Sequence, residues 1–402
     1  MEEWSKYTLP EIASFSQGKQ IPVENQINAP QEGYIRFIRI VDYTSGWTQA
    51  PRYVECDSKY HINSDDIVMI RYGTPGKVFR GVRGLIANNM FKITVDESII
   101  TKDYAFWYLS QEKVYQQLLS SQSSTTMPAI SFGMLKNVVI EVPPIIVQNR
   151  ICRVLNSIQA KIDLNNRINH NLEQQAQALY KSWFIDFEPF KNGKFVDSEL
   201  GTIPEGWRVG TLSELGDIVA GGTPSKARAD YYTDNGIHWL TPKDLSNRCD
   251  KYTSRGETDI TELGYYNSSA KLMPRGSVLF SSRAPIGYIT IAKNDICTNQ
   301  GFKSVIPKYA GTYYIYYWLS DNTDNIESQS SGSTFKEASG SLMKCFPALI
   351  PPKEILDCFE KRLEPLMHQQ EILEEEIHNL SCMRDHLLPD LMSGVITTQL
   401  TC

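Results

Sequence analysis

Two stretches of the chain carry apolar residues at a repeat of seven. In residues 151–183 the repeating positions are Ile151, Leu155, Ile158, Ile162, Asn165, Asn169, Leu172, Ala176, Leu179 and Trp183. In residues 359–391 they are Phe359, Leu363, Leu366, Gln370, Leu373, Ile377, Leu380, Arg384, Leu387 and Leu391. Alternating spacings of four and three over this length are typical of the a and d positions of a coiled coil. The pattern therefore predicts two long helices.

The two stretches share one register, because Phe359 falls on Ile151 and Leu391 falls on Trp183. Two ordinary core helices in separate domains are the simpler interpretation. However, a helix rises about 1.5 Å per residue, so each stretch would extend for roughly 50 Å, more than a compact domain of this size needs. We expect an antiparallel pair, with Pro365 kinking the second helix or marking its start. The apolar residues assigned to its seam and to partner docking are Ile151, Leu155, Ile158, Ile162, Leu172, Leu179, Leu363, Leu366, Leu373, Ile377, Leu380 and Leu387.

The rest of the chain alternates short β-prone runs with turn residues. The runs rich in β-branched and aromatic residues predict strands at 34–40, 67–71, 91–95, 237–240, 278–280 and 288–291. Segments 103–119 and 312–320 are rich in Tyr, Trp and Leu and predict helices that pack on these strands. Residues 187–206 lack periodicity and contain Gly, Pro and charge, which indicates a link. The predicted fold class is α+β, with two mixed α/β globular domains joined by the two long helices.

The two predicted globular domains resemble each other. RGSVLFSSRAPIG at residues 275–287 is similar to DDIVMIRYGTPG at 65–76, with a central apolar run in each. WSKYTLPEI at 4–12 matches WRVGTLSEL at 207–215, so that Trp, Thr-Leu and Glu keep their places. The matches never break order along the chain. The sequence is therefore a tandem duplication whose period is too long for a solenoid repeat.

The duplication also covers a pair of amide residues. NNMFK at residues 88–92 aligns with NQGFK at 299–303.

The predicted parts are a first globular domain at 1–145, a first spacer helix at 146–190, a link with the second globular domain at 191–352, and a second spacer helix with its tail at 353–402.

The charge of the chain is unevenly distributed. Of the 402 residues, the net charge of −6 comes from residues 353–402, which hold 4 basic and 10 acidic side chains. Residues 1–145 hold 14 and 15, and residues 191–352 hold 17 and 17. Because the globular domains are neutral, the net charge does not argue against a nucleic-acid partner.

Cysteine use and hydropathy indicate a cytoplasmic protein. The eight cysteines form no Cys-x-x-Cys pair, and no secretory leader is recognisable at the N-terminus, so disulfides and a metal site are both poorly supported. The apolar runs fall short of the roughly 20 residues that a membrane span needs. We expect no membrane association.

Basic residues on glycine-rich loops are the candidates for DNA contact. Glycine lets the backbone approach phosphates, and arginine can grip guanine with two hydrogen bonds. A solvated hairpin with incidental charge, or a flexible linker where Ser and Thr dominate, is the alternative for each loop. The candidates in the first domain are Arg71, Tyr72, Lys77, Arg80, Arg83, Thr125 and Thr126. Those in the second domain are Thr223, Lys226, Arg228, Lys243, Arg283, Ser333, Thr334 and Lys336.

Catalytic motifs are absent from the sequence. It has no Asn-Pro-Pro-Tyr/Phe tetrapeptide for amino-methylation and no His-Glu-x-x-His for a metal hydrolase. GTPGKV at residues 73–78 lacks the spacing and the Ser/Thr of a phosphate loop. We therefore assign no catalytic residue and no metal ligand.

Several motifs together resemble one family. They are IPEGW at 203–207, GGTPS at 221–225, WLTPKDL at 239–245, GSVLF at 276–280 and NQGF at 299–302. With the two helices, this ordered set is similar to the DNA specificity subunit of type I restriction-modification systems. The first repeat departs from it, since it has NNMF for NQGF and lacks GGTP.

The resemblance implies two target-recognition domains that read a bipartite, asymmetric site on double-stranded DNA. It further implies helices that set the half-site spacing and dock two adenine-N6 methyltransferase subunits, with motor-nuclease subunits completing the complex. S-adenosylmethionine, ATP and magnesium would belong to those partners, and this chain would bind no cofactor.

Two other classes of function remain open from the residues. One is a non-catalytic interaction scaffold with two ligand-binding globules on a coiled-coil strut. The other is a self-sufficient methyltransferase, which would need a cofactor-binding fold that the sequence does not indicate. Salt dependence of DNA binding separates the first from a DNA reader, because each neutralised phosphate steepens the loss of affinity with salt.

Overall fold

The computed structural model describes residues 4–44, 50–120, 129–246, 250–332 and 336–396. The chain divides into two compact units. Unit 1 comprises residues 1–162 and 379–402, and unit 2 comprises residues 163–378. Each unit therefore contains one globular domain and a part of each of two long helices.

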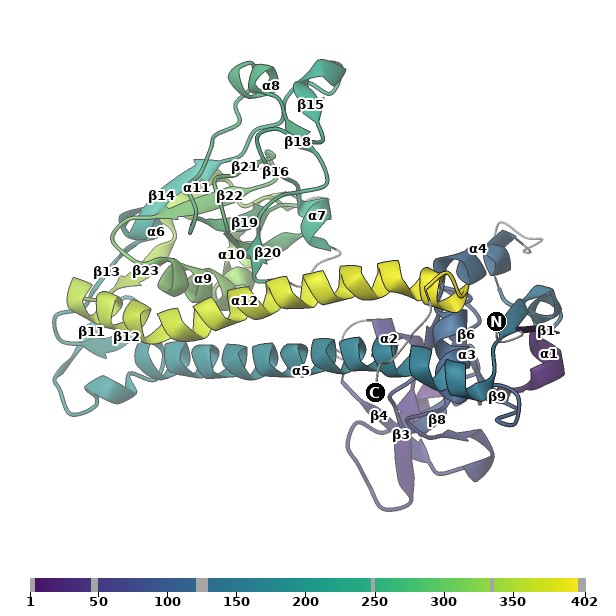
Figure 1. Cartoon of the computed structure of the whole chain (residues 1–402). Helices are drawn as coiled ribbons and strands as arrows, with labels where there is room; N and C mark the ends of the chain where they lie inside the picture. The colour runs from purple at the N-terminus through teal and green to yellow at the C-terminus, as the bar shows by residue number, and fades with distance from the viewer. Residues whose placement is uncertain (1–3, 45–49, 121–128, 247–249, 333–335, 397–402) are drawn as a thin grey trace. The chain divides into compact units, whose positions relative to one another are not determined.

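The two long helices are α5 (Ile145–Phe184) and α12 (Lys353–Met392), each of 40 residues. Both heptad stretches lie within them, so the predicted helices are confirmed (Figure 1). Pro365 lies inside α12, which begins at Lys353, and the expectation that it marks the helix start is wrong. Lys353 follows Pro351-Pro352, and a proline directly before a helix start leaves no hydrogen bond unmade.

Unit 1 is built on two four-stranded sheets and a strand pair. Its strands are β1 (Ser5–Thr8), β2 (Ala13–Gln17), β3 (Tyr34–Ile38), β4 (Arg52–Glu55), β5 (His61–Ile62), β6 (Ile67–Ile70), β7 (Val78–Phe79), β8 (Gly84–Ile86), β9 (Met90–Val95) and β10 (Val139–Val142). Its short helices are α1 (Leu9–Ile12), α2 (Ile40–Thr44), α3 (Lys102–Leu109) and α4 (Glu112–Ser120). The sheets have the orders β2-β9-β6-β7 and β4-β3-β8-β5, and β1 pairs with β10.

Unit 2 contains a five-stranded sheet and four strand pairs. Its strands are β11 (Phe195–Ser198), β12 (Gly201–Pro204), β13 (Arg208–Thr211), β14 (Gly216–Ala220), β15 (Tyr232–Thr233), β16 (Trp239–Leu240), β17 (Tyr252–Thr253), β18 (Asp259–Ile260), β19 (Val278–Ser282), β20 (Ile286–Ala292), β21 (Cys297–Thr298), β22 (Lys303–Pro307) and β23 (Pro347–Ile350). Its helices are α6 (Leu212–Leu215), α7 (Pro242–Ser246), α8 (Glu262–Tyr266), α9 (Thr312–Asp321), α10 (Thr323–Gln329) and α11 (Gly340–Cys345). The main sheet has the order β14-β22-β19-β20-β17.

The sheet orders confirm the duplication. The order β2-β9-β6-β7 of unit 1 recurs as β14-β22-β19-β20 in unit 2. Both domains open with the same helix start, because Thr8 pairs with Glu11 and Thr211 with Glu214 in capping boxes. The capping box satisfies the free N–H groups of the first helical turn, which explains the shared Thr-Leu and Glu.

The segment predicted as a featureless link is more ordered than expected. Residues 195–204 form the antiparallel hairpin β11–β12, with Phe195 opposite Pro204. Gly201 at its turn has φ +95°, which glycine adopts without strain. The prediction missed this hairpin because its strands are short and carry little apolar alternation.

Within each unit, the two long helices pair antiparallel and contribute to the core. In unit 2, Trp183 near the end of α5 packs on Phe359 near the start of α12, and Asn165 bonds to Glu376 at 2.8 Å. In unit 1, Leu155 of α5 shares a core cluster with Leu391 of α12. In each unit, the long helices therefore pack both against each other and against the globular core.

Candidate nucleic-acid interface

A hollow of about 460 Å³ on unit 2 collects four of the predicted DNA-contacting residues. Thr223, Lys226, Lys243 and Arg283 all line it. They come from three separate segments: Thr223 and Lys226 from the loop after β14, Lys243 from the start of α7, and Arg283 from the loop after β19. The fold therefore brings residues that are 60 positions apart in sequence to one surface.

Two of these cations have acidic neighbours at the surface. Lys243 pairs with Glu257 at 3.0 Å, and Arg283 pairs with Glu337 at 3.7 Å. Ion pairs between exposed side chains contribute little, about 0–1 kcal/mol, so a phosphate can compete for either cation. Lys226 is exposed, and among the described residues its ammonium forms no ion pair.

Two other candidates of unit 2 lie apart from the hollow lining. Arg228 forms two hydrogen bonds with Asp230, at 2.8 and 2.6 Å, and lies over the ring of Tyr231. Lys336 pairs with Glu327 at 3.8 Å. Arg228 is thus held by its own loop, and the sequence alone did not predict this local pairing.

The loop after β6 carries the candidates of unit 1. Lys77 and Arg83 are exposed, and Arg71 lies 5.1 Å from the ring centroid of its neighbour Tyr72. Gly73 has φ +89° and nothing within 4 Å of its Cβ position, so it supplies the turn at an open surface. Arg71, Tyr72 and Lys77 lie in this loop, whereas Arg83 lies in the next one, between β7 and β8.

Arg80 has a structural position instead. It pairs with Asp103 of α3, donates to Asn156 Oδ1 of α5 at 2.9 Å, and stacks 4.2 Å from the Phe106 ring. Trp107 Nε1 donates to the same Asn156 oxygen at 2.8 Å. The guanidinium therefore joins α3 to α5 inside unit 1, and we leave it out of the proposed interface.

Some candidates fall elsewhere. Thr125, Thr126, Ser333 and Thr334 lie outside the described residues. Five of the twelve seam residues assigned to partner docking are buried within their own units, and the other seven are half-buried. Ile151, Leu155, Ile162, Leu363 and Leu373 are buried, at 5 % exposure or less. Those five side chains serve helix packing, so a docking face requires other residues of the same helices.

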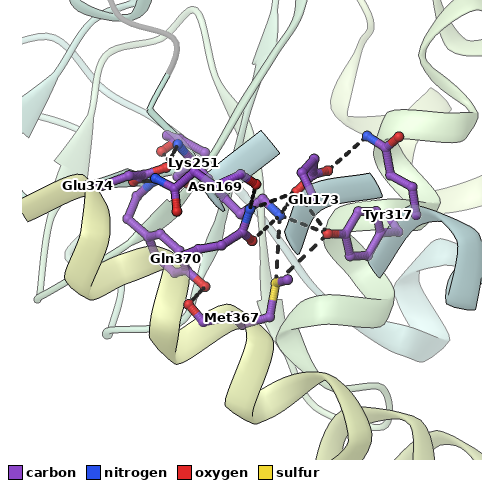
Figure 2. Close-up of polar contacts among 10 residues, drawn as sticks. Asn169, Glu173, Lys251, Tyr317, Met367, Gln370 and Glu374 are labelled. Atoms are coloured by element: carbon purple, nitrogen blue, oxygen red, sulfur yellow. Dashed lines mark hydrogen bonds and ion pairs between the residues drawn. The ribbon is translucent and has the colours of Figure 1, made fainter. Parts of the chain in front are cut away.

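A buried lysine anchors the globular domain of unit 2 to the helices. Lys251 is 6 % exposed, and its ammonium pairs with Glu173 of α5 (Figure 2). It also donates to Tyr317 Oη at 2.7 Å and to Gln370 Oε1 of α12 at 3.0 Å. Burial lowers the pKa of Lys251, while the Glu173 carboxylate opposes that shift.

Polar seam residues complete the same cluster. Gln370 Nε2 donates to the Asn169 carbonyl at 3.1 Å and to Glu173 Oε2 at 3.3 Å. Tyr317 Oη donates to Glu173 Oε2 at 3.1 Å. Burying a polar group costs free energy unless the group is hydrogen-bonded, so these bonds favour one arrangement of α5, α12 and the globular domain.

Acidic side chains of α12 bind the globular domain of unit 2. Glu374 accepts hydrogen bonds from the backbone N–H groups of Lys251, at 2.9 Å, and Tyr252, at 3.1 Å. Glu371 pairs with Arg275 at 2.8 Å, and Glu375 pairs with Lys293 at 3.3 Å. The acidity of residues 353–402 thus holds the globular domain, which the sequence pattern did not reveal.

Two carboxylates of α12, those of Glu374 and Glu360, have raised pKa values. Burial raises the pKa of Glu374 to about 7, against the lowering effect of its two backbone donors. Burial also raises the pKa of Glu360 to about 7, although the N–H groups of Tyr314 and Tyr313 donate to it at 2.8 and 3.2 Å. Those N–H groups belong to the first turn of α9, so Glu360 caps that helix.

Among the residues that the structure describes, no group of three or more His, Cys, Asp or Glu side chains is placed to hold a metal ion. None of the described helices is both long and apolar enough to cross a membrane.

Comparisons with known proteins identify the family. The family described as type I restriction modification DNA specificity domain matches residues 1–174 and again residues 204–379. The type I restriction enzyme MjaIX specificity subunit of Methanocaldococcus jannaschii is 38% identical over 192 residues, which span 45% of this chain and 44% of that relative. The HindI specificity subunit of Haemophilus influenzae is 25% identical over 476 residues, covering 98% of this chain and 100% of that protein.

A solved structure shares the fold. The S subunit of a type I restriction-modification system from M. genitalium superimposes with a TM-score of 0.58 at 15% identity, over 97% of this chain and 96% of that chain. At this identity the likeness concerns the fold alone. The double match of one family to the two halves agrees with the duplicated sheet order.

Proposed function

Because the chain belongs to the type I restriction-modification DNA specificity family, we propose that its two globular domains read the two halves of a bipartite DNA site. Family membership supports DNA sequence recognition, and the chain is a non-catalytic specificity subunit. The assignment of one half-site to each globular domain rests on the duplication. Two copies of one sheet with different loops suit two different half-sites.

The hollow of unit 2 is the observation that carries the proposal. It gathers Lys226, Lys243 and Arg283 with the hydroxyl of Thr223. Cations and hydroxyls that converge on one open surface are suited to phosphate oxygens and base edges. In unit 1 the loops on either side of β7, which carry Lys77 and Arg83, take the corresponding role.

We further propose that the long helices dock two adenine methyltransferase subunits, and that motor-nuclease subunits complete the complex. S-adenosylmethionine, ATP and magnesium would be bound by those partners. Exposed apolar side chains on the helices support this proposal, since Leu164 of α5 is 43% exposed and Ile372 of α12 is 46% exposed. Apolar side chains exposed on a helix are available to a protein partner.

Salt-dependent DNA binding tests the DNA-reading function. The chain, purified with its methyltransferase, is titrated onto a fluorescent random-sequence duplex of about 40 base pairs at several salt concentrations. We expect the logarithm of the affinity to fall linearly with the logarithm of salt, and Lys226→Ala and Arg283→Ala each to reduce that slope by about one. Lys308→Ala is the control, because Lys308 is exposed but pairs with Asp217 at the far end of β22. Binding without salt dependence would favour the scaffold alternative.

A further inference from the structure

A single glutamine at the hollow of unit 2 has the chemistry of a base reader. Gln300 lines the hollow together with Asn299 and Gly301, in the turn between β21 and β22. Its side chain is exposed, and among the described residues it has no hydrogen-bond partner. The residue was visible in the sequence only as part of the NQGF motif, which gave no reason to separate it from its neighbours.

The backbone under Gln300 is held by its surroundings. Asn299 Oδ1 accepts from Gly301 N at 2.8 Å, and Asn299 N donates to Leu240 O at 2.9 Å. Ser282 N of β19 donates to Gly301 O at 2.7 Å. A Cβ on Gly221 would stand 1.9 Å from Asn299 O, so the loop after β14 also closes on this turn.

Two neighbouring amides therefore have different roles. The side-chain amide of Asn299 accepts a hydrogen bond within the turn, whereas the side-chain amide of Gln300 makes none among the described residues. A side chain on a fixed turn loses little backbone freedom when it binds a ligand, and such preorganisation favours affinity. The turn can present one donor and one acceptor at a defined place.

The other polar groups of the hollow leave this role to Gln300. Asp244 is occupied, since it accepts from Thr241 N at 2.7 Å and from Glu257 N at 3.0 Å. The ammonium and guanidinium groups at the hollow are donors only, so they suit phosphate oxygens or the two acceptors of guanine. An amide, in contrast, matches the N6 donor and N7 acceptor of adenine in the major groove.

We propose that Gln300 reads one adenine of the half-site bound by unit 2, by donating to N7 and accepting from N6. This inference rests on the DNA-reading function proposed above and adds to it a residue and a base. The matching residue of unit 1, Asn89, has its Oδ1 buried without a partner among the described residues, so the inference concerns unit 2 alone.

Binding competition at single positions tests the proposal. The methylation motif of the wild-type complex defines a duplex of about 40 base pairs, and each A·T pair of the motif is changed to G·C in turn. For the wild-type complex, one change should weaken binding about 5- to 150-fold through loss of the Gln300 contact. In Gln300→Ala that penalty should disappear at this one position and persist at all others.

A second variant and a control sharpen the test. Gln300→Glu lacks the donor for N7, so it should also lose the adenine preference and should favour cytosine, whose N4 donates to a carboxylate. Gln329→Ala is the matched control, because Gln329 is exposed on the same unit but lines a different hollow. It should keep the wild-type profile.

The two possible failures distinguish the role of Gln300 from the DNA-reading function of the chain. If Gln300→Ala keeps the wild-type penalty at every position while the wild-type complex prefers its motif, Gln300 reads no base and the DNA-reading function stands. If the wild-type complex prefers no sequence over random DNA, both proposals are overturned.

Discussion

Lys251 and Glu173 form an ion pair inside unit 2, although 78 residues separate them in the sequence. Glu173 belongs to α5, whereas Lys251 directly precedes β17 of the globular domain. The pair therefore ties the globular domain to the spacer helix. In the proposed function, such a tie holds the DNA-reading domain in one position on its helix.

Removing the lysine should destabilise unit 2. Lys251→Met leaves the Glu173 carboxylate beside Tyr317 and Gln370 without its cation, and breaking a buried pair in this way costs about 3–5 kcal/mol. Urea unfolding followed by tryptophan fluorescence measures the loss. Arg275→Met is the control, because the Arg275 side chain is 63% exposed, and its loss should cost less than about 1 kcal/mol. Equal effects of the two changes would contradict the anchoring role.

Stability should fall as the pH rises from about 5 to 8. Glu360 and Glu374 have pKa values near 7 in the folded chain, against an ordinary value of 4.5. The folded state therefore binds more protons than the unfolded state in this window, so raising the pH favours unfolding. The cost of ionising each buried carboxylate is complete by about pH 8 and amounts to at most about 3 kcal/mol.

Glutamine variants isolate this effect from other titrating groups. Relative to the wild type, Glu360→Gln and Glu374→Gln should each be more favourable at pH 8.5 than at pH 5.5, when the free energies of unfolding are compared. Thermal or urea unfolding at the two pH values gives the difference. A pH-independent difference between variant and wild type would mean that neither carboxylate titrates in this range.

Arg80 and Arg83 should behave differently despite their proximity in sequence. Arg80→Ala removes the ion pair with Asp103 and the bond to Asn156, so it should lower the stability of unit 1 by about 1–3 kcal/mol. Arg83→Ala, at an exposed position, should leave stability unchanged within about 0.5 kcal/mol and weaken DNA binding. Unfolding curves and salt-dependent binding of both variants check this, and reversed effects would show that the two residues have been assigned to the wrong roles.

Partner docking should depend on exposed helix positions. Leu164→Asp and Ile372→Asp should reduce co-purification with the methyltransferase without changing the unfolding curve, because a charge at a protein interface must be desolvated. Leu263→Asp is the control, since Leu263 is 48% exposed on α8, away from the long helices. Stoichiometric co-purification of both helix variants would place the docking face elsewhere.

Deletion of residues 360–392 would not serve this purpose. The segment includes Leu363 and Met367 of the unit 2 core and Leu388 and Leu391 of the unit 1 core. Its removal would therefore unfold both units, and loss of assembly would say nothing about docking.

The sequence predicted the periodic features well. The heptads of Ile151 and Phe359 marked α5 and α12, and the apolar runs at Ile67 and Val278 marked the equivalent strands β6 and β19. Helices and strands are readable because their apolar residues recur at a spacing set by the local geometry of the backbone. The partner of a charged side chain follows no such spacing along the sequence.

The anchoring residues were missed for that reason. Arg80 lies in a basic, glycine-rich stretch, so its sequence context is that of a DNA contact, and only the fold places Asp103 and Asn156 beside it. Lys251 lies in a polar loop, and nothing near it in sequence indicates that Glu173 and Gln370 will enclose it. Long-range contacts decide the role of a cation, and one sequence does not contain them.

Sequencing of methylated adenines tests the central claim most directly. Cells that carry the methyltransferase are compared with and without this chain, and then with the chain restored. We predict one bipartite adenine-methylation motif, two short defined parts around an undefined spacer, that vanishes without the chain and returns with it. An unchanged set of motifs, or a restored motif without a spacer, would contradict the account of two DNA readers on one chain.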